Sequence, residues 1–163
     1  MRRRSSLEIS CKSERGEYIG QGKDYQSPSR DDLKLGVMTT VKDGVMNSVE
    51  FAVENTKVSS SWWRFEFAAP KGAALRRGEY ANATRFSFNS GEEAGLDISG
   101  PGRGSNKIFG KFTVEKIRFN RAGDKIVEFC ATFEQHSERP NAPALTGTIS
   151  YFEPKNITPR KKS

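Results

Sequence analysis

Apolar residues recur at every second position, in run after run, between Leu7 and Phe152. The clearest run is Trp63, Phe65 and Phe67, and glycine-rich or polar turns separate the runs from one another. Successive side chains of a β-strand point to opposite faces, so a period of two places one face of each run on a core and the other in water. The pattern therefore predicts an all-β chain.

The runs predict ten strands joined by turns. We expect them at residues 7–12, 18–20, 33–41, 45–53, 61–68, 84–89, 96–98, 107–120, 125–135 and 144–152. Asp43-Gly44 predicts a tight hairpin, because both residues tolerate positive φ angles, and residues 121–124 predict a second hairpin. Residues 91–106 hold five glycines and one proline, which predicts a long loop around one short strand.

Sequential strands with short connections predict a single antiparallel β-sandwich, jelly-roll or immunoglobulin-like, with nine to ten strands and little helix. At most one helical turn is expected, at residues 31–33 or 91–94. The length of 163 residues fits one domain. We place the sandwich at residues 7–154, between basic tails at 1–6 and 155–163 that we expect to be disordered.

The formal net charge of +7 comes from the ends of the chain. Seven basic residues lie outside residues 5–154: Arg2, Arg3, Arg4, Lys155, Arg160, Lys161 and Lys162. Of the 27 Lys and Arg, 20 remain inside that segment against all 20 Asp and Glu, so the body is formally neutral. Specific nucleic-acid binding uses a basic stripe on the folded body, so no specific nucleic-acid partner is expected. Basic tails favour an acidic partner or surface.

No stretch approaches the roughly 18 continuous apolar residues that a membrane span requires. The basic start at residues 1–6 is followed by no apolar segment, so no signal peptide is expected and a cytoplasmic location is the default. Cys11 takes the apolar-facing register of its run, whereas Cys130 alternates out of phase with Phe129 and Ala131. Two free thiols are therefore favoured over a bridge between them.

The sequence contains no recognisable catalytic motif. His136 is the one histidine, its neighbour Ser137 points to the opposite face of the strand, and no GxSxG elbow is present. We therefore expect a strand-end histidine that bonds loop backbone, and a protein that is not an enzyme. A hydrolase is the minor hypothesis, which a cleft with two carboxylates of raised pKa would favour.

No cofactor is predicted. The glycine-rich residues 99–106 lack the Lys-Ser/Thr ending of a Walker loop, so we expect them to shape an arch with Arg103 anchored to a carboxylate or a carbonyl. One histidine and no CxxC argue against a zinc site of the common kind. A structural calcium is the minor alternative, because several carboxylates stand in or beside loops. They are Glu17, Asp24, Glu92, Glu93 and Asp97.

Aromatic residues give the leading candidate site. The alternation that buries the 63–67 series turns Trp62, Arg64 and Glu66 outward. A tryptophan ring on a sheet face packs well against the apolar face of a sugar, so the sequence predicts a non-catalytic module that binds carbohydrate or a cell-surface ligand weakly. Tyr18 and Tyr80 extend this platform. The alternatives are that a loop covers Trp62, and that the chain is a protein-interaction or structural domain using an apolar patch or an open edge strand.

A set of short motifs covers most of the chain: GEYIGQG at 16–22, FEFAAP at 65–70, GEYANATRFSF at 78–88, residues 96–106, GKFTV at 110–114, FEQH at 133–136 and ALTG at 144–147. Together they resemble a family of uncharacterised bacterial β-sandwich proteins, most of them exported. The resemblance implies the same fold and no established activity. Relatives carry cysteines where this chain has Ser105 and Ser137, which implies that the two residues lie within a disulfide's reach of each other. The loss of both cysteines fits a domain outside an oxidising compartment.

Overall fold

Ten β-strands and one short 3-10 helix make up residues 3–155, the part of the chain that the computed structural model describes. The strands are β1 (Ser6–Ser13), β2 (Tyr25–Gln26), β3 (Leu33–Lys42), β4 (Val45–Asn55), β5 (Trp62–Ala68), β6 (Gly78–Arg85), β7 (Gly95–Ser99), β8 (Ile108–Phe119), β9 (Ile126–Ser137) and β10 (Ala144–Phe152). The helix, η1 (Arg30–Asp32), is a single turn. The prediction of an all-β fold with little helix is confirmed.

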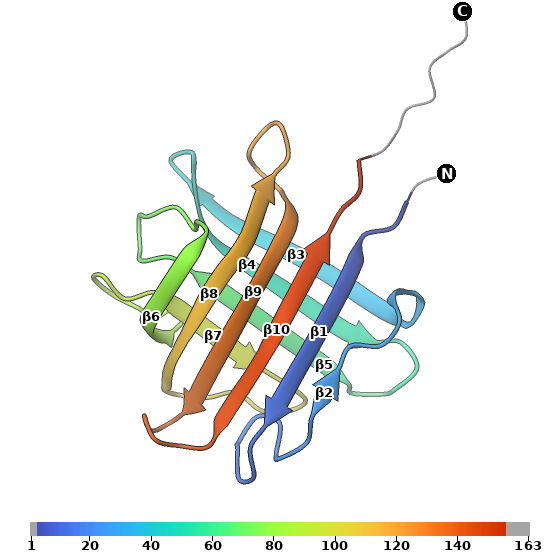
Figure 1. Ribbon diagram of the computed structural model, residues 1–163, viewed down its shortest axis with the longest axis vertical. Helices are drawn as coiled ribbons and strands as arrows, with labels where there is room; N and C mark the ends of the chain where they lie inside the picture. Colours follow the sequence, from blue (N-terminus) through green and yellow to red (C-terminus); the bar gives the residue numbers. More distant parts are fainter. Residues whose placement is uncertain (1–2, 156–163) are drawn as a thin grey trace, which may run out of the picture.

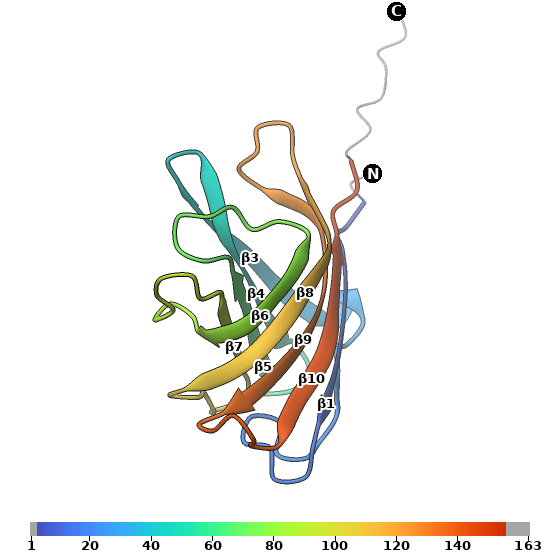
Figure 2. The same cartoon turned by 60° about the vertical axis from the view of Figure 1, so that its left-hand side comes forward.

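The strands form one continuous sheet, in the order β2-β1-β10-β9-β8-β6-β7-β5-β4-β3, which folds over into two layers (Figure 1, Figure 2). The front layer holds β1, β2, β6, β8, β9 and β10, and the back layer holds β3, β4, β5 and β7. β6 connects the layers, because it pairs with β8 on one side and with β7 on the other. The β6–β7 pair is parallel, so the expectation of a wholly antiparallel sandwich needs this one correction.

Aromatic side chains from both layers fill the space between them. Phe51 of β4 lies 5.4 Å from Phe129 of β9 between ring centroids, and Phe67 of β5 lies 5.3 Å from Phe112 of β8. Phe65 and Phe67 are fully buried, as the alternation predicts. Aromatic pairs of this kind contribute about 0.5–1.5 kcal/mol each beyond the area they bury, so they stabilise the packing of the back layer on the front layer.

Residues 18–20, predicted as a strand, form a turn. The buried carboxylate of Glu17 accepts hydrogen bonds from the backbone N–H groups of Ile19 (2.8 Å) and Gly20 (2.6 Å), and from the hydroxyl of Ser13 (2.7 Å). Backbone groups that hydrogen-bond to a side chain are no longer free to pair with a neighbouring strand. The strand that pairs with β1 on this side is instead the two-residue β2.

The bounds predicted for the strand at 84–89 are wrong, because the structure has β6 at Gly78–Arg85 instead. Beyond Arg85 the chain turns, with the N–H of Phe88 donating to the carbonyl of Arg85 (2.9 Å), and Phe88 is 72% exposed. The buried side chain of Asn89 stabilises the turn by donating to the carbonyl of Glu93 (3.0 Å). The apolar alternation at Phe86 and Phe88 therefore lies in a loop.

Two local predictions from the sequence are confirmed. Asp43 and Gly44 have φ angles of 52° and 76°, which makes a tight hairpin between β3 and β4. Both cysteines are free thiols: Cys11 is buried in the core, and Cys130 is half-buried on the opposite face of its strand, 3.3 Å from the hydroxyl of Ser150.

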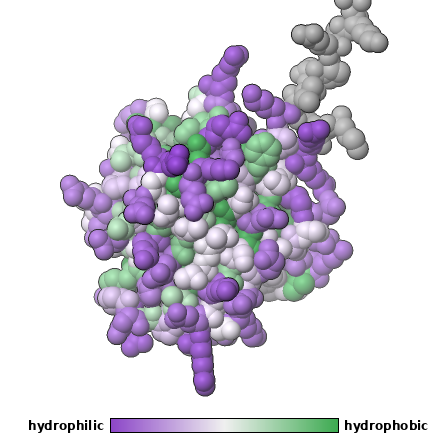
Figure 3. All heavy atoms as spheres, viewed as in Figure 1, coloured by the Kyte–Doolittle hydropathy of each residue, from purple (hydrophilic) through white to green (hydrophobic). Residues whose placement is uncertain are grey.

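The sequence predicts basic tails at both ends, and residues 1–2 and 156–163 lie outside the described residues. At the described N-terminal end, Arg4 forms an ion pair with Asp31 (2.7 Å), and Arg30 donates to the carbonyl of Ser5 (3.0 Å). Within residues 3–155 no helix is long and apolar enough to cross a membrane. On the front face, apolar surface is divided into small areas between hydrophilic side chains (Figure 3).

Candidate functional site

A pocket of about 300 Å³ lies on the outer face of the back layer, over β5 and β7. We call it the Trp62 pocket. It is lined by Trp62, Arg64, Glu66, Arg85, Asp97, Ser99 and residues 102–105. Three of the five residues predicted for the ligand site therefore share one hollow.

The register of the sheet brings these side chains together. In β5, the alternation that buries the 63–67 series turns Arg64 and Glu66 outward. β7 pairs with β5 so that Glu66 stands opposite Asp97, and Arg64 stands opposite Ser99. Residues directly opposite on one face of a strand pair have Cβ atoms about 5 Å apart, so the four side chains form a compact polar group.

The glycine-rich segment after β7 closes one side of the pocket. Gly100 and Arg103 exchange two backbone hydrogen bonds of 3.1 Å each, which folds the segment into a tight loop. Gly100 packs against the indole of Trp63, and a Cβ there would lie only 3.2 Å from the ring. The position therefore favours glycine, and the loop brings Arg103 to the rim of the pocket.

A row of three carboxylates crosses the outer face of the back layer. Glu50 of β4 stands opposite Glu66 of β5, which in turn stands opposite Asp97 of β7. Arginines flank the row: Arg64 forms an ion pair with Glu50 (2.7 Å), and Arg85 lies 3.6 Å from Asp97. The mixture of charges offers both donors and acceptors to a bound molecule.

The two carboxylates inside the pocket have raised pKa values. Burial raises the pKa of Glu66 to about 7, and the nearby charges of Asp97 and Glu50 add to this effect. Burial also raises the pKa of Asp97 to about 6, although the guanidinium groups of Arg85 and Arg64 oppose it. At neutral pH Glu66 is therefore divided between its protonated and ionised forms, and can either donate or accept a hydrogen bond.

Two buried polar atoms in the pocket wall lack a hydrogen-bond partner. They are Nε of Arg85 and Oδ1 of Asp97. The 3.6 Å between Nε of Arg85 and Oδ2 of Asp97 is an ion-pair distance and is too long for a good hydrogen bond. Unpartnered buried polar groups are costly, so this pair of charges is an energetically unfavourable part of the pocket wall.

Trp62 borders the pocket with its side chain in contact with water. The residue is 37% exposed, whereas the adjacent Trp63 is 6% exposed, so the two tryptophans divide between surface and core. A second hollow, of about 320 Å³, lies on the other side of Trp62 and is also lined by Lys34 and Glu54. The indole therefore stands between two hollows on one face.

Tyr18 reaches the rim of the pocket through Arg103. The guanidinium of Arg103 lies 4.8 Å from the centre of the Tyr18 ring, a cation–π contact. With its amide oxygen turned toward the guanidinium, Gln21 accepts from Nη2 of Arg103 at 3.1 Å. Arg103 is thus held by an aromatic ring and by the side-chain carbonyl of Gln21, in agreement with the carbonyl anchor expected from the sequence.

Tyr80 lies elsewhere. Its ring stacks on Phe112 in the front layer with 4.7 Å between centroids, and its hydroxyl bonds the backbone N–H and carbonyl of Arg76. The structure does not bring Tyr80 to the Trp62 pocket.

His136 is held by its neighbours, as the sequence predicts. Nδ1 lies 2.6 Å from the carbonyl of Ala142, and Nε2 lies 2.8 Å from Oε1 of Glu134. Burial lowers the pKa of His136, but these two hydrogen bonds, together with the charges of Glu134 and Glu14, outweigh it and leave the pKa raised. Within residues 3–155 no three His, Cys, Asp or Glu side chains converge so as to hold a metal ion.

Sequence reasoning missed part of the site. The sequence places Arg85 in the strand expected at 84–89, with no role in the site, and points to Asp97 only as a candidate calcium ligand. Both reach the pocket because β7 pairs with β5 antiparallel and with the end of β6 in parallel. The one signal in the sequence was Asp97 at the centre of a short apolar strand, where a charge needs a partner.

Comparison with protein-family models, with curated proteins and with solved structures finds no match for this chain. The site is therefore interpreted from its own geometry.

Proposed function

We propose that the protein is a carbohydrate-binding module and that the Trp62 pocket is its site. The observation that carries the proposal is the exposed indole of Trp62 beside a hollow lined by arginine and carboxylate side chains. Sugars present an apolar face of C–H groups and a rim of hydroxyls. An aromatic ring next to charged hydrogen-bonding groups is complementary to both.

Each wall of the pocket has a role in this proposal. The indole of Trp62 packs against the apolar face of one sugar ring. Arg64 and Asp97 bond its hydroxyls, and charge-assisted hydrogen bonds of this kind are the stronger ones. The second hollow, beyond Trp62, accommodates the next unit of a chain. Sites this shallow bind weakly, so affinity in use depends on several copies.

A hydrolase is the second candidate, and one observation favours it. Glu66 and Asp97 face the same pocket from adjacent strands, with pKa values raised to about 7 and about 6. Glycoside hydrolysis needs one carboxylic acid with a raised pKa and one ionised carboxylate. Glu66 has the higher pKa of the two, so Glu66 would be the acid and Asp97 the ionised carboxylate.

A protein-interaction role rests on a different feature, the edge strand β3. Among residues 3–155, β3 ends the sheet and pairs with β4 alone, and Met38 on it is 63% exposed. A partner strand can add to such an edge. This alternative needs no small-molecule site.

The test is calorimetric titration of the protein with a panel of soluble oligosaccharides, alongside Trp62→Ala. We expect saturable binding that weakens at least tenfold in Trp62→Ala. Phe109→Ala removes another exposed aromatic ring, on β8 in the front layer, and should bind like the parent protein. Equal binding by Trp62→Ala and the parent protein would overturn the proposal.

The hydrolase candidate is tested on the same oligosaccharides by release of reducing ends. Turnover that Glu66→Gln abolishes, while binding persists, would establish hydrolysis. Binding without turnover over the range from pH 5 to pH 8 would leave a binding module.

A further inference from the structure

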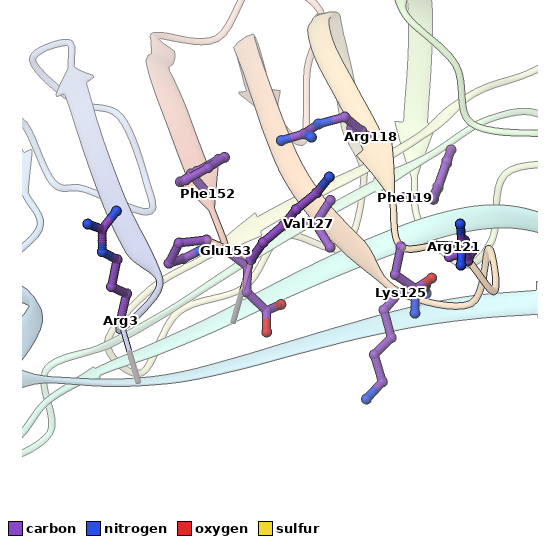
Figure 4. A pocket seen from close by; sticks show the side chains of 11 residues that line it. Arg3, Arg118, Phe119, Arg121, Lys125, Val127, Phe152 and Glu153 are labelled. Carbon is purple, nitrogen blue, oxygen red and sulfur yellow. Dashed lines mark hydrogen bonds between the residues drawn. The ribbon is translucent and has the colours of Figure 1, made fainter. Parts of the chain in front are cut away.

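A hollow of about 870 Å³ is separate from the Trp62 pocket and shares no lining residue with it. We call it the terminal pocket. It lies where the β8–β9 hairpin, the end of β10 and the residue Arg3 ahead of β1 come together (Figure 4). The volume is within the range of small-molecule sites, roughly 300–1,000 Å³.

A bulge in β9 gives the terminal pocket an apolar floor. Arg118 pairs with Glu128 and Phe119 pairs with Ile126, so Val127 is an extra residue in its strand. The alternation that buries Phe129 and Ala131 would also bury Val127, but the bulge interrupts it. Val127 is therefore half-buried in the pocket wall. Other apolar walls come from Phe119 and Phe152, which are 36% and 40% exposed.

The rim of the terminal pocket is strongly basic. Five basic side chains and one carboxylate line it, a formal charge of +4, where the body as a whole is neutral. The cations are Arg3, Arg118, Arg121, Lys125 and Lys155, and the carboxylate is Glu153. The residues come from three segments: Arg3 and Lys155 belong to the basic ends of the chain, and the other cations lie on the β8–β9 hairpin.

Most of these cations have no carboxylate partner among the described residues. Arg118 is the exception, with its Nε 3.1 Å from Glu128. Glu153, the one carboxylate of the lining, accepts a hydrogen bond from the hydroxyl of Tyr151 (3.3 Å). The rim therefore presents like charges close together, an arrangement that a bound anion would stabilise.

We propose that the terminal pocket binds an amphiphilic anion: a carboxylate or phosphate group attached to an apolar chain, as in a fatty acid or a single-chain phospholipid. The anionic group is bound by Arg121 and Lys125 of the β8–β9 hairpin, and the chain lies on Phe119, Val127 and Phe152. A bare inorganic anion would leave the apolar floor in water. A neutral apolar molecule would leave the cations unmatched.

The test is calorimetric titration with dodecanoate below its micelle concentration. Decyl maltoside, a neutral amphiphile, and inorganic phosphate, an anion without a chain, serve as comparison ligands. We expect saturable binding of dodecanoate, at least tenfold tighter than either comparison ligand. Binding of dodecanoate no tighter than decyl maltoside or phosphate would overturn the proposal.

Two variants keep the result specific to this pocket. Arg121→Gln with Lys125→Gln should weaken dodecanoate binding roughly fivefold, and Phe152→Ser should weaken it by a similar factor. All three residues are on the surface, so the fold should be retained, as a thermal melt will verify. Arg139→Gln, an exposed basic residue at another loop, and Trp62→Ala should bind normally. Unchanged binding in both terminal-pocket variants would overturn the assignment.

Vesicles distinguish the source of the ligand. Co-sedimentation with phosphatidylglycerol vesicles but not with phosphatidylcholine vesicles, together with dodecanoate binding, would indicate a membrane lipid as source. Dodecanoate binding without co-sedimentation would indicate a free fatty acid. Vesicle binding in the absence of dodecanoate binding would replace the single-molecule site by a charged surface, and so overturn it.

Discussion

The hydroxyls of Ser105 and Ser137 lie 2.6 Å apart and share a buried hydrogen bond. Ser105 belongs to the glycine-rich loop that carries Arg103, and Ser137 ends β9. The side-chain proximity implied for these two positions by the family resemblance is therefore present in the fold. The bond holds one wall of the Trp62 pocket to the front layer.

The pair Ser105→Cys with Ser137→Cys should form a disulfide. It would cross-link residues 32 positions apart, and limiting the unfolded chain in this way stabilises by roughly 3–4 kcal/mol. Denaturant unfolding of the oxidised and reduced double variant measures the difference. A Cys130→Ser background avoids exchange with the half-buried native thiol. If peptide mass mapping finds no 105–137 link after oxidation, the geometry inferred here is wrong.

Glu66→Gln should change the pH dependence of stability. The folded-state pKa of Glu66 is about 7, above its ordinary value of 4.5, so between these pH values the folded state holds a proton that the unfolded state has released. Stability conferred by the protonated form is thus complete below pH 4.5 and falls as pH rises to about 7. Glutamine cannot ionise, so Glu66→Gln does not lose this stability. The melting temperature of Glu66→Gln minus that of the parent protein should therefore increase as pH rises across this window. Parallel profiles for the two proteins, or a gain equal to that of Glu115→Gln at the exposed surface, would contradict the raised pKa.

The two thiols should differ in reactivity. Burial, and then the charge of Glu17, raises the pKa of Cys11 to about 12, so almost no reactive thiolate forms near pH 8. Cys130 is half-buried and reaches solvent. With a disulfide reagent, we expect one thiol to react in the native protein and the second only as fast as the protein unfolds. Cys130→Ser should lose the fast reaction, and a fast reaction that persists in this variant would place Cys11 at the surface.

Gly147→Ala should destabilise the front layer. A Cβ at this position of β10 would meet the backbone carbonyl of Ser10, and would lie 2.7 Å from the ring of Phe133. Overpacking of this kind costs about 2 kcal/mol or more, because backbone on one side and a core ring on the other must move. Gly104→Ala is the matched control, since no atom lies within 4 Å of its Cβ position. Urea unfolding should separate the two variants, and equal midpoints would show that β10 has room to shift.

Alternation predicted most of the strands because it reports which face of a strand meets the core. The strand at 144–152 has the predicted bounds, and Asp43-Gly44 forms the predicted hairpin between β3 and β4. The strand predicted at 18–20 is wrong because one buried carboxylate, that of Glu17, bonds the backbone there. A hydrogen bond between a side chain and the nearby backbone leaves no periodic trace in a sequence.

The candidate site was predictable only within one strand. Trp62, Arg64 and Glu66 follow from the period of β5, and their outward direction is confirmed. Asp97 and Arg85 depend on which strand pairs with β5, and in which register. Tyr80 lies in the part of β6 that pairs with β8, in the front layer. Strand order is set by long-range pairing, which a local pattern does not encode.

The continuity of the sheet through β6 also limits how this protein can self-associate. Two separate layers would end in four strands with unpaired backbone groups, each a template for another chain. A single sheet that passes from one layer to the other ends in only two within the described residues, β2 and β3. β2 is two residues long, and β3 is interrupted by a bulge at Thr40/Val41 and has lysines at both of its ends, Lys34 and Lys42. A strand shared between layers thus reduces the backbone edge on which copies of this chain could aggregate edge to edge.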